Sequence, residues 1–112
     1  MLIREKDRLA LLDIFASANV PFEVWAYGSR VNGDAHSGSD LDLVIRSHDL
    51  KRIPAAVFGS LYHNIKESNI PILVELKDWA LLPSYFHANI ERKYEVLFDN
   101  RSNFVQADIR TA

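Results

Sequence analysis

The chain has 112 residues, 48% of them hydrophobic, which is enough apolar material for one core but not for two. Thirteen Lys and Arg residues against fifteen Asp and Glu give a formal net charge of -2. This balance gives no support to direct nucleic-acid binding or to a membrane-surface protein. Without cysteine there is no disulfide framework, and no apolar segment approaches the roughly 20 residues of a membrane-spanning helix. We therefore expect one domain over residues 1–112, located in the cytoplasm.

The first half of the chain predicts one long helix and two strands. Apolar residues at helical spacing predict a helix over 4–18, which an asparagine and a proline then end. The aromatic and β-branched segment 22–27 predicts a strand that stops at Gly28, and a short helical turn is expected to begin at Ser29. A second strand is predicted over 41–46, entered through a loop of glycine and serine.

The second half predicts a helix over 50–68, a strand over 70–77 and a closing helix over 84–97. From about residue 99 the periodicity is weak, and this tail is expected to be irregular or to dock on a partner. The alternation of helices and strands indicates a small α/β or α+β fold, with a mixed sheet of about three to four strands and helices on one face.

Two aspartates stand at the start of the second predicted strand. Because side chains alternate along a strand, Asp40 and Asp42 share one face, while Leu41 and Leu43 share the other. The leucine face supplies the core, so the carboxylates point outward. Two nearby carboxylates raise each other's pKa, and both can stay ionised when a divalent cation bridges them. Oxygen ligands, with neither Cys nor paired His at hand, favour a hard cation such as Mg²⁺.

Two further features are expected to meet these aspartates. Glu75 is an acid inside the otherwise apolar strand 70–77, which makes it a candidate third ligand or general base. Gly28 and Ser29 end the first strand in a turn whose backbone N–H groups and hydroxyl suit a phosphate. If the first two strands pair antiparallel, this phosphate turn faces the metal ligands.

Gly28-Ser29, ten residues, and then Asp40-x-Asp42 form the pattern GSx10DxD. On these residues and on the order of its elements, the chain resembles the minimal nucleotidyltransferases of the polymerase-beta-like nucleotidyltransferase superfamily. The resemblance implies that fold, an ATP-like substrate, two Mg²⁺ ions and transfer of a nucleoside monophosphate to a hydroxyl. The nucleotide-binding residues that it implies are Gly28, Ser29, Arg30 and Ser39. The catalytic and metal-binding residues that it implies are the acids Asp40, Asp42 and Glu75, of which the last is most often aspartate in the family.

The resemblance also implies a partner. Minimal nucleotidyltransferases typically pair with a helical HEPN protein, an RNA-cleaving toxin, and in the better understood pairs they act as antitoxins that transfer AMP from ATP to a tyrosine of the toxin. The HEPN pattern of Arg, four residues, then His is absent from this sequence. We therefore expect this chain to be the antitoxin of such a pair and not the toxin. The chain is also too short to include a second domain that would hold an acceptor, so the acceptor is expected to come from another protein.

Two other functions stay open at this point. The chain could be a free-standing nucleotidyltransferase that acts on a small hydroxylated molecule such as an antibiotic, or a non-catalytic antitoxin that neutralises its partner by binding. Four aromatic residues are either core or a surface that a partner covers: Trp25, Trp79, Tyr85 and Phe86. Asp78 is expected to cap a helix or turn.

Overall fold

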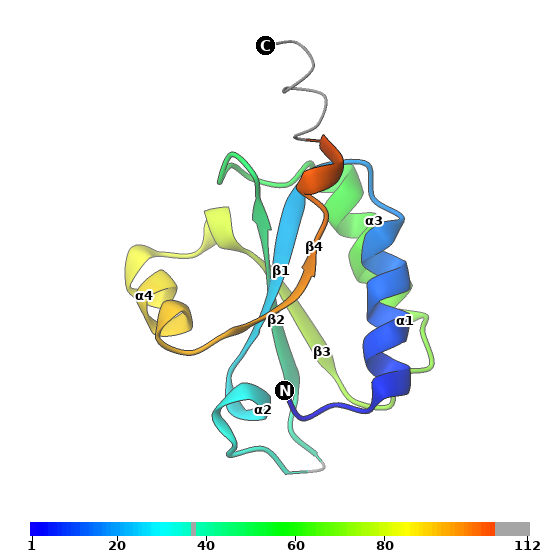
Figure 1. Cartoon of the computed structure of the whole chain (residues 1–112), viewed down its shortest axis with the longest axis vertical. Coiled ribbons are helices and arrows are strands. Elements are labelled where there is room, and N and C mark those ends of the chain that lie inside the picture. Colours follow the sequence, from blue (N-terminus) through cyan, green and yellow to red (C-terminus); the bar gives the residue numbers. More distant parts are fainter. Residues whose placement is uncertain (37, 105–112) are drawn as a thin grey trace.

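A computed structural model describes residues 1–36 and 38–104, which form a four-stranded mixed sheet with helices on both faces (Figure 1). The strands lie in the order β3-β2-β1-β4. The elements in chain order are α1 (Glu5–Ala16), β1 (Phe22–Tyr27), α2 (Ser29–Asn32), β2 (Leu41–Ser47), α3 (Ala55–Lys66), β3 (Val74–Asp78), the 3-10 helix η1 (Trp79–Leu81), α4 (Ser84–Arg92) and β4 (Glu95–Asp99). The predicted mixed α/β class is confirmed.

The register of the three central strands brings distant residues together. β2 pairs antiparallel with β1, as the sequence predicts, and parallel with β3. Tyr27 is paired with Asp42 across the first of these interfaces, and Asp42 with Glu75 across the second. Because paired residues in neighbouring strands point their side chains to the same face, these three residues form one row across the sheet.

One face of the sheet packs against α1 and α3 (Figure 1). Leu41, Leu43 and Ile45 of β2 point to this side and are fully buried, together with Phe15 of α1. Burying one such side chain stabilises a fold by roughly 1.5–3 kcal/mol. The prediction that the leucine face of β2 supplies the core is therefore confirmed.

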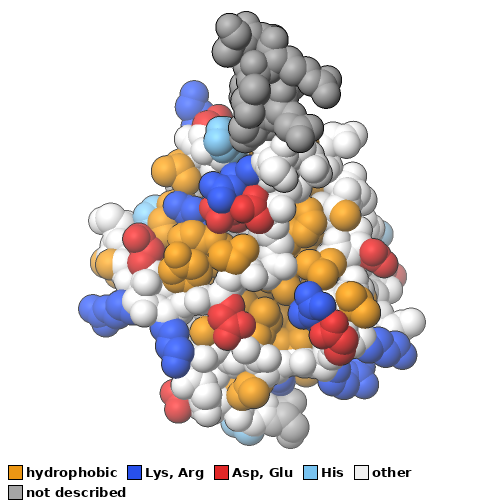
Figure 2. Space-filling model, in the orientation of Figure 1, with side chains coloured by type: hydrophobic (Ala, Val, Ile, Leu, Met, Phe, Trp, Pro, Cys, Tyr) orange, Lys and Arg blue, Asp and Glu red, His pale blue; other side chains and the backbone are white. Residues whose placement is uncertain are grey.

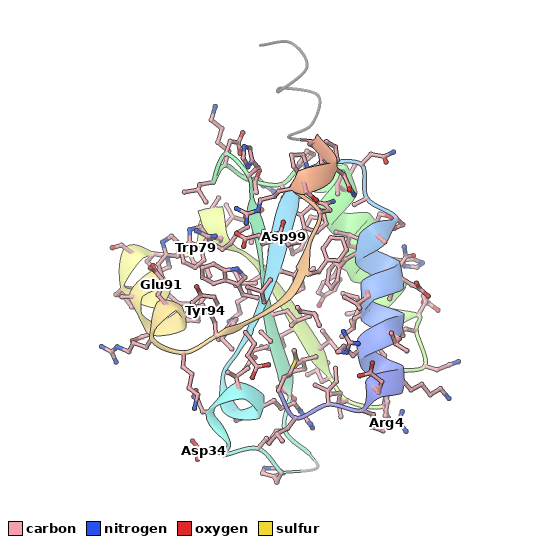
Figure 3. All side chains as sticks on the ribbon, viewed as in Figure 1. Arg4, Asp34, Trp79, Glu91, Tyr94 and Asp99 are labelled. Atoms are coloured by element: carbon pink, nitrogen blue, oxygen red, sulfur yellow. The ribbon has the colours of Figure 1, made fainter. Side chains whose placement is uncertain are left out.

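The other face packs against α4, so the prediction of helices on one face only was wrong. Trp25 and Val44 alternate away from the first core, and they are too apolar to be left in water. They pack with Trp79 and with Ile90 of α4 into a second buried cluster; Figure 3 shows Trp79 on the α4 side of the sheet. The two tryptophans are therefore core residues, whereas Tyr85 is 70% exposed.

Two elements begin later than predicted. The helix expected over 50–68 begins only after Pro54, and Leu50, with a φ of 61°, belongs to a turn. The strand expected over 70–77 begins only at Val74, and Pro71, which lacks the N–H group that a strand ladder requires, lies outside it. Pro54 directly precedes α3 and marks its boundary.

The closing helix is shorter than predicted, because residues 95–97 at the end of the predicted range belong to a strand. α4 ends at Arg92, and the following residues form β4, which pairs antiparallel with β1 and buries Leu97. Just beyond β4 the buried Asn100 accepts a hydrogen bond from the N–H of Phe22 at 2.8 Å and donates to the carbonyl of Val20 at 3.0 Å. The predicted irregular tail is therefore anchored at its start, and its part over 105–112 lies outside the described residues. Within the described part of the chain, no helix is long and apolar enough to cross a membrane.

Candidate active site

The turn at the end of β1 depends on Gly28. Its φ of 80° lies in a region that residues with a side chain rarely adopt. Its carbonyl accepts hydrogen bonds from the N–H groups of Val31 and Asn32, at 3.0 and 2.9 Å, and α2 begins directly after it at Ser29. A Cβ atom on Gly28 would collide with the Oδ2 atom of Asp42. Glycine thus permits both the turn and the close approach of an acid from β2.

The three predicted acids gather next to this turn. Asp42 and Glu75 are paired residues of neighbouring strands, and both are half-buried, as is Asp40. Burial raises the pKa of Asp42, and the charges of Glu75 and Asp40 raise it further, whereas Lys77 lowers it. The region therefore holds more negative charge than its own cations balance.

This charge imbalance suits a hard cation. Carboxylate oxygens are the ligands that Mg²⁺ prefers, and an added positive charge would relieve the repulsion between Asp42 and Glu75. Across residues 1–36 and 38–104, no three His, Asp or Glu side chains are arranged closely enough to hold an ion as they stand. Binding would therefore require the side chains of Asp40, Asp42 and Glu75 to converge.

Tyr27 is a member of the row that the sequence pattern did not single out. Its hydroxyl is buried and finds no hydrogen-bond partner among the described residues. Burial and the charges of Asp42 and Glu75 raise the pKa of Tyr27 to about 12, so the phenol stays protonated and can donate to a ligand. The sequence did contain a feature that could have identified Tyr27, because alternation along the strand 22–27 places it on the face opposite the core.

Lys77 and Phe86 border the same row. The Nζ atom of Lys77 lies 5.1 Å from the centroid of the Phe86 ring. The Phe86 ring meets the ring of Tyr27 edge-on, with 6.1 Å between centroids. Lys77 stands two residues after Glu75 on the same face of β3, a spacing that could have indicated its place beside the acids.

Arg30 and Ser39 hold the loop that leads into β2. The guanidinium group of Arg30 is buried and donates to the carbonyls of Ser39, at 2.9 Å, of Leu2 and of His36. The hydroxyl of Ser39 accepts a hydrogen bond from the N–H of His36 at 3.0 Å. In the structure both side chains therefore position the loop that carries Asp40, and the nucleotide contacts expected of them stay predictions.

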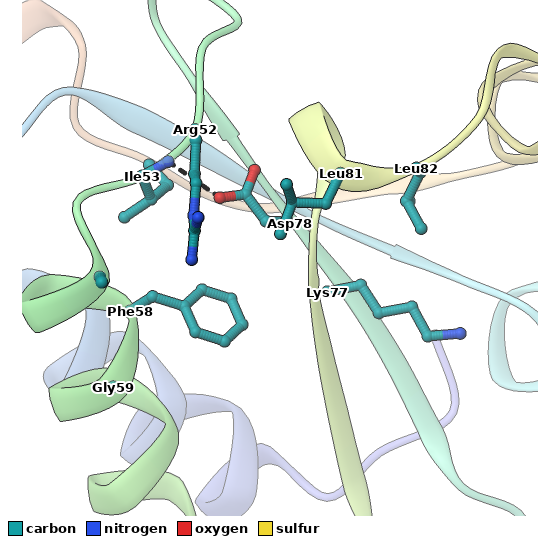
Figure 4. Close-up of a pocket in the computed structure, with 9 residues that line it drawn as sticks. Arg52, Ile53, Phe58, Gly59, Lys77, Asp78, Leu81 and Leu82 are labelled. Carbon is teal, nitrogen blue, oxygen red and sulfur yellow. Dashed lines mark hydrogen bonds between the residues drawn. The ribbon is translucent and has the colours of Figure 1, made fainter.

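A separate hollow of about 360 Å³ lies beside edge strand β3 (Figure 4). Residues of α3, of η1 and of the segments next to them line it, among them Arg52, Phe58, Lys77, Leu81 and Leu82. The carboxylate of Asp78 accepts hydrogen bonds from the N–H groups of Ala80, at 3.0 Å, and Ile53, at 2.8 Å. Asp78 is thus a cap, as predicted, and it joins two walls of the hollow.

Comparison with known proteins assigns the chain to a family. The family model described as "Polymerase beta, Nucleotidyltransferase" matches residues 10–103. The matched region includes the Gly28 turn, the acids of β2 and β3, and all four strands of the sheet. The chain therefore belongs to the polymerase beta nucleotidyltransferase family, and the enzyme class that the sequence predicts is confirmed.

One curated protein and one solved structure are similar to this chain over most of its length. A protein of Haemophilus influenzae named probable protein adenylyltransferase MntA is 36% identical over 94 residues, which are 83% of this chain and 81% of that protein. This relative confirms the resemblance to minimal nucleotidyltransferases. A solved structure described as "Crystal structure of the toxin-antitoxin with AMP-PNP" matches with a TM-score of 0.66 and 13% identity, over 94% of this chain and 83% of that one. At that identity the match shows a shared fold.

Proposed function

We propose that this chain is a Mg²⁺-dependent nucleotidyltransferase that moves AMP from ATP to a tyrosine hydroxyl of a partner HEPN toxin and so acts as its antitoxin. The observation that carries the proposal is the meeting of Gly28, Asp42 and Glu75 at one end of three adjacent strands. The chain that places them there is 36% identical to a probable protein adenylyltransferase. A cytoplasmic location is part of the proposal.

The proposed reaction breaks the bond between the α-phosphorus of ATP and its pyrophosphate, and forms a bond from that phosphorus to the acceptor oxygen. Gly28 and Ser29 would bind phosphate oxygens through backbone N–H groups and a hydroxyl. The carboxylate of Glu75 would accept the proton of the acceptor hydroxyl, or complete the metal site. Mg²⁺ held by Asp40, Asp42 and Glu75 would offset the charge of the phosphates.

The partner is supported by the solved neighbour, which is described as a toxin-antitoxin with AMP-PNP and shares the fold over 94% of this chain. Apolar groups that a protein could cover are also exposed on η1 and α4. Leu81 of η1 and Tyr85 of α4 are 62% and 70% exposed.

The test is intact-mass spectrometry of the protein encoded by a neighbouring HEPN-type reading frame, after incubation with this chain, ATP and Mg²⁺. We expect the partner to gain the mass of AMP on a tyrosine. Asp42→Asn should abolish the gain, because an amide is a poor ligand for a hard cation. Asp13→Asn makes the same chemical change at an exposed position of α1 and should leave the gain intact.

Other results would point elsewhere. A partner that is bound and inactivated but never modified would support a non-catalytic antitoxin. Modification of a small hydroxylated molecule without any partner would support a free-standing enzyme. Full modification by Asp42→Asn would overturn the assignment of the site.

A further inference from the structure

A pocket opens between the Gly28 turn and α4. Its volume is about 340 Å³, within the range of roughly 300–1,000 Å³ that is typical of small-molecule sites. Two segments far apart in the sequence line it, with Tyr27, Gly28, Asn32, Phe86, Asn89 and Arg92 among the lining residues. The acids of β2 and β3 do not line it. The pocket is therefore a space beside the acids and on the other side of the Gly28 turn.

The pocket combines aromatic and amide groups. The edge-on pair of Phe86 and Tyr27 contributes ring surface, against which a flat base can pack. Asn32 from α2 and Asn89 from α4 contribute side-chain amides, each with one acceptor oxygen and two N–H donors. Amides of this kind form hydrogen bonds with the edge of a base or with ribose hydroxyls.

The position of the pocket fixes which end of a nucleotide it would hold. Gly28 belongs both to the pocket and to the predicted phosphate turn, so a nucleotide with its phosphates on the turn has its nucleoside within reach. The exposed Arg92 and Lys93 also line the pocket, and basic groups attract a polyanion. Figure 2 shows Lys and Arg side chains on the α4 side of the molecule.

An acceptor tyrosine fits this pocket less well. Its hydroxyl must reach the α-phosphate beside Asp42 and Glu75, neither of which lines the pocket. A phenol also has a single polar atom, so it offers fewer bonds to the two amides than a nucleoside does. A nucleoside has polar atoms on both base and sugar.

We propose that this pocket holds the nucleoside part of the nucleotide, with the amides of Asn32 and Asn89 bonded to its base or ribose. The inference rests on the proposed function, because it takes as given that a nucleoside triphosphate binds at the Gly28 turn. It adds to that function the part of the molecule that recognises the nucleoside.

Isothermal titration calorimetry of the full chain with Mg²⁺ tests this, with ATP and inorganic tripolyphosphate as separate ligands. Tripolyphosphate keeps the phosphates and lacks the nucleoside. Asn89→Leu should weaken ATP binding about tenfold, the effect of one or two lost hydrogen bonds, and leave tripolyphosphate binding unchanged. Asn64→Leu, the same change at an exposed position of α3, should alter neither. Asn32→Leu should change the two affinities in the same way as Asn89→Leu. Because Asn32 lies in α2, the same result there would exclude local distortion of α4 as the cause.

The outcomes separate the two proposals. Unchanged ATP affinity in both pocket variants would overturn the nucleoside pocket and leave the proposed function standing. Equal weakening of ATP and tripolyphosphate would also overturn it, since the amides would then act on phosphates or on the fold. A wild-type chain that binds neither ligand would overturn the proposed function and the pocket together.

Discussion

The sheet face under α4 carries charge at both ends, and the two ends are built differently. At one end Glu23 and Arg46 form an ion pair of 2.8 Å between largely buried side chains. The guanidinium of Arg46 lies over the rings of both Trp25 and Trp79, 4.1 and 4.4 Å from their centroids. The indole N–H of Trp25 also donates to Glu23 at 3.3 Å. Each charge at this end meets an opposite charge or an aromatic face, and only the buried Nε of Arg46 has no hydrogen-bond partner here among the described residues.

At the other end like charges face each other. Asp42 and Glu75 stand side by side, so that burial raises the pKa of Asp42 and repulsion from Glu75 raises it further. The hydroxyl of Tyr27 points into this end without a hydrogen-bond partner among the described residues. Repulsion and an unpaired hydroxyl both destabilise a fold, and such groups are concentrated where a ligand supplies what is missing. The comparison teaches that one end stabilises the protein and the other is prepared for a ligand.

The largest stability effect is expected at the paired end. Arg46→Met should lower the free energy of unfolding by about 2–3 kcal/mol, because Glu23 would stay buried with a single charged partner, Arg101, at 3.3 Å and 40% exposed, besides its bond from the Trp25 indole. Urea denaturation followed by circular dichroism measures the change. Arg8→Met breaks the exposed pair with Glu5 and should change the free energy of unfolding far less, because solvent screens this pair. Equal losses in the two variants would contradict a stabilising role for this end.

Gly28→Ala should act on both fold and function. A positive φ and a collision with Asp42 should lower the free energy of unfolding by about 2 kcal/mol. Displacement of the Asp42 carboxylate should also abolish AMP transfer. Gly59→Ala is the matched control, since nothing lies within 4 Å of its added Cβ and it sits in α3, where alanine stabilises by about 0.5–1 kcal/mol. Similar melting temperatures for the two variants would contradict the strained geometry.

At the repulsive end, substitutions should stabilise. Tyr27→Phe removes a buried hydroxyl without a partner and should raise the free energy of unfolding by about 1 kcal/mol in the absence of nucleotide. Tyr62→Phe, at a residue 38% exposed, should change little. Thermal unfolding of both variants measures the difference. A destabilised Tyr27→Phe would show that the hydroxyl is already satisfied in the folded protein.

The smallest expected effect on stability is that of Asp42→Asn, and it depends on pH. Because the pKa of Asp42 is raised in the fold, the folded protein binds this proton more tightly than the unfolded chain does. That contribution to stability is complete below the ordinary pKa of 3.8 and is lost as pH rises through the raised pKa. At neutral pH the free energy of unfolding of Asp42→Asn should therefore be higher than that of the wild type by only ~0.5 kcal/mol, since solvent screens a half-exposed group. Thermal melts across pH should show the gap closing toward about pH 3, and a gap that widens on acidification would contradict the shift.

The strands that position the acids could be predicted because their signals are local. The segment 22–27 coincides with β1, and 41–46 differs from β2 by one residue. Antiparallel pairing of these two strands brings the end of β1 to the start of β2, and the register that pairs Tyr27 with Asp42 then places Gly28 beside Asp42. The spacing between Gly28-Ser29 and Asp40-x-Asp42 was therefore enough to predict the centre of the candidate site.

The remaining features depend on contacts that local spacing does not show. β4 follows a helix directly, and its partner is β1, near the other end of the chain. Its apolar residues fit a helical pattern as well as a strand, and the pairing decides between them. The collision that forbids a side chain on Gly28 likewise depends on register. The pocket between Asn32 and Asn89 exists only because α4 folds over the second face.

The bond between Arg30 and the first residues has a practical consequence. The N–H of Leu2 donates to the carbonyl of Arg30 at 2.9 Å, and the Arg30 guanidinium donates back to the carbonyl of Leu2. The same guanidinium holds the carbonyl of Ser39, next to Asp40. A substitution that removes this guanidinium would therefore loosen the first residues and the loop before Asp40 at the same time. Lost activity in an Arg30 variant would not by itself identify a nucleotide contact, because the same change also releases this loop.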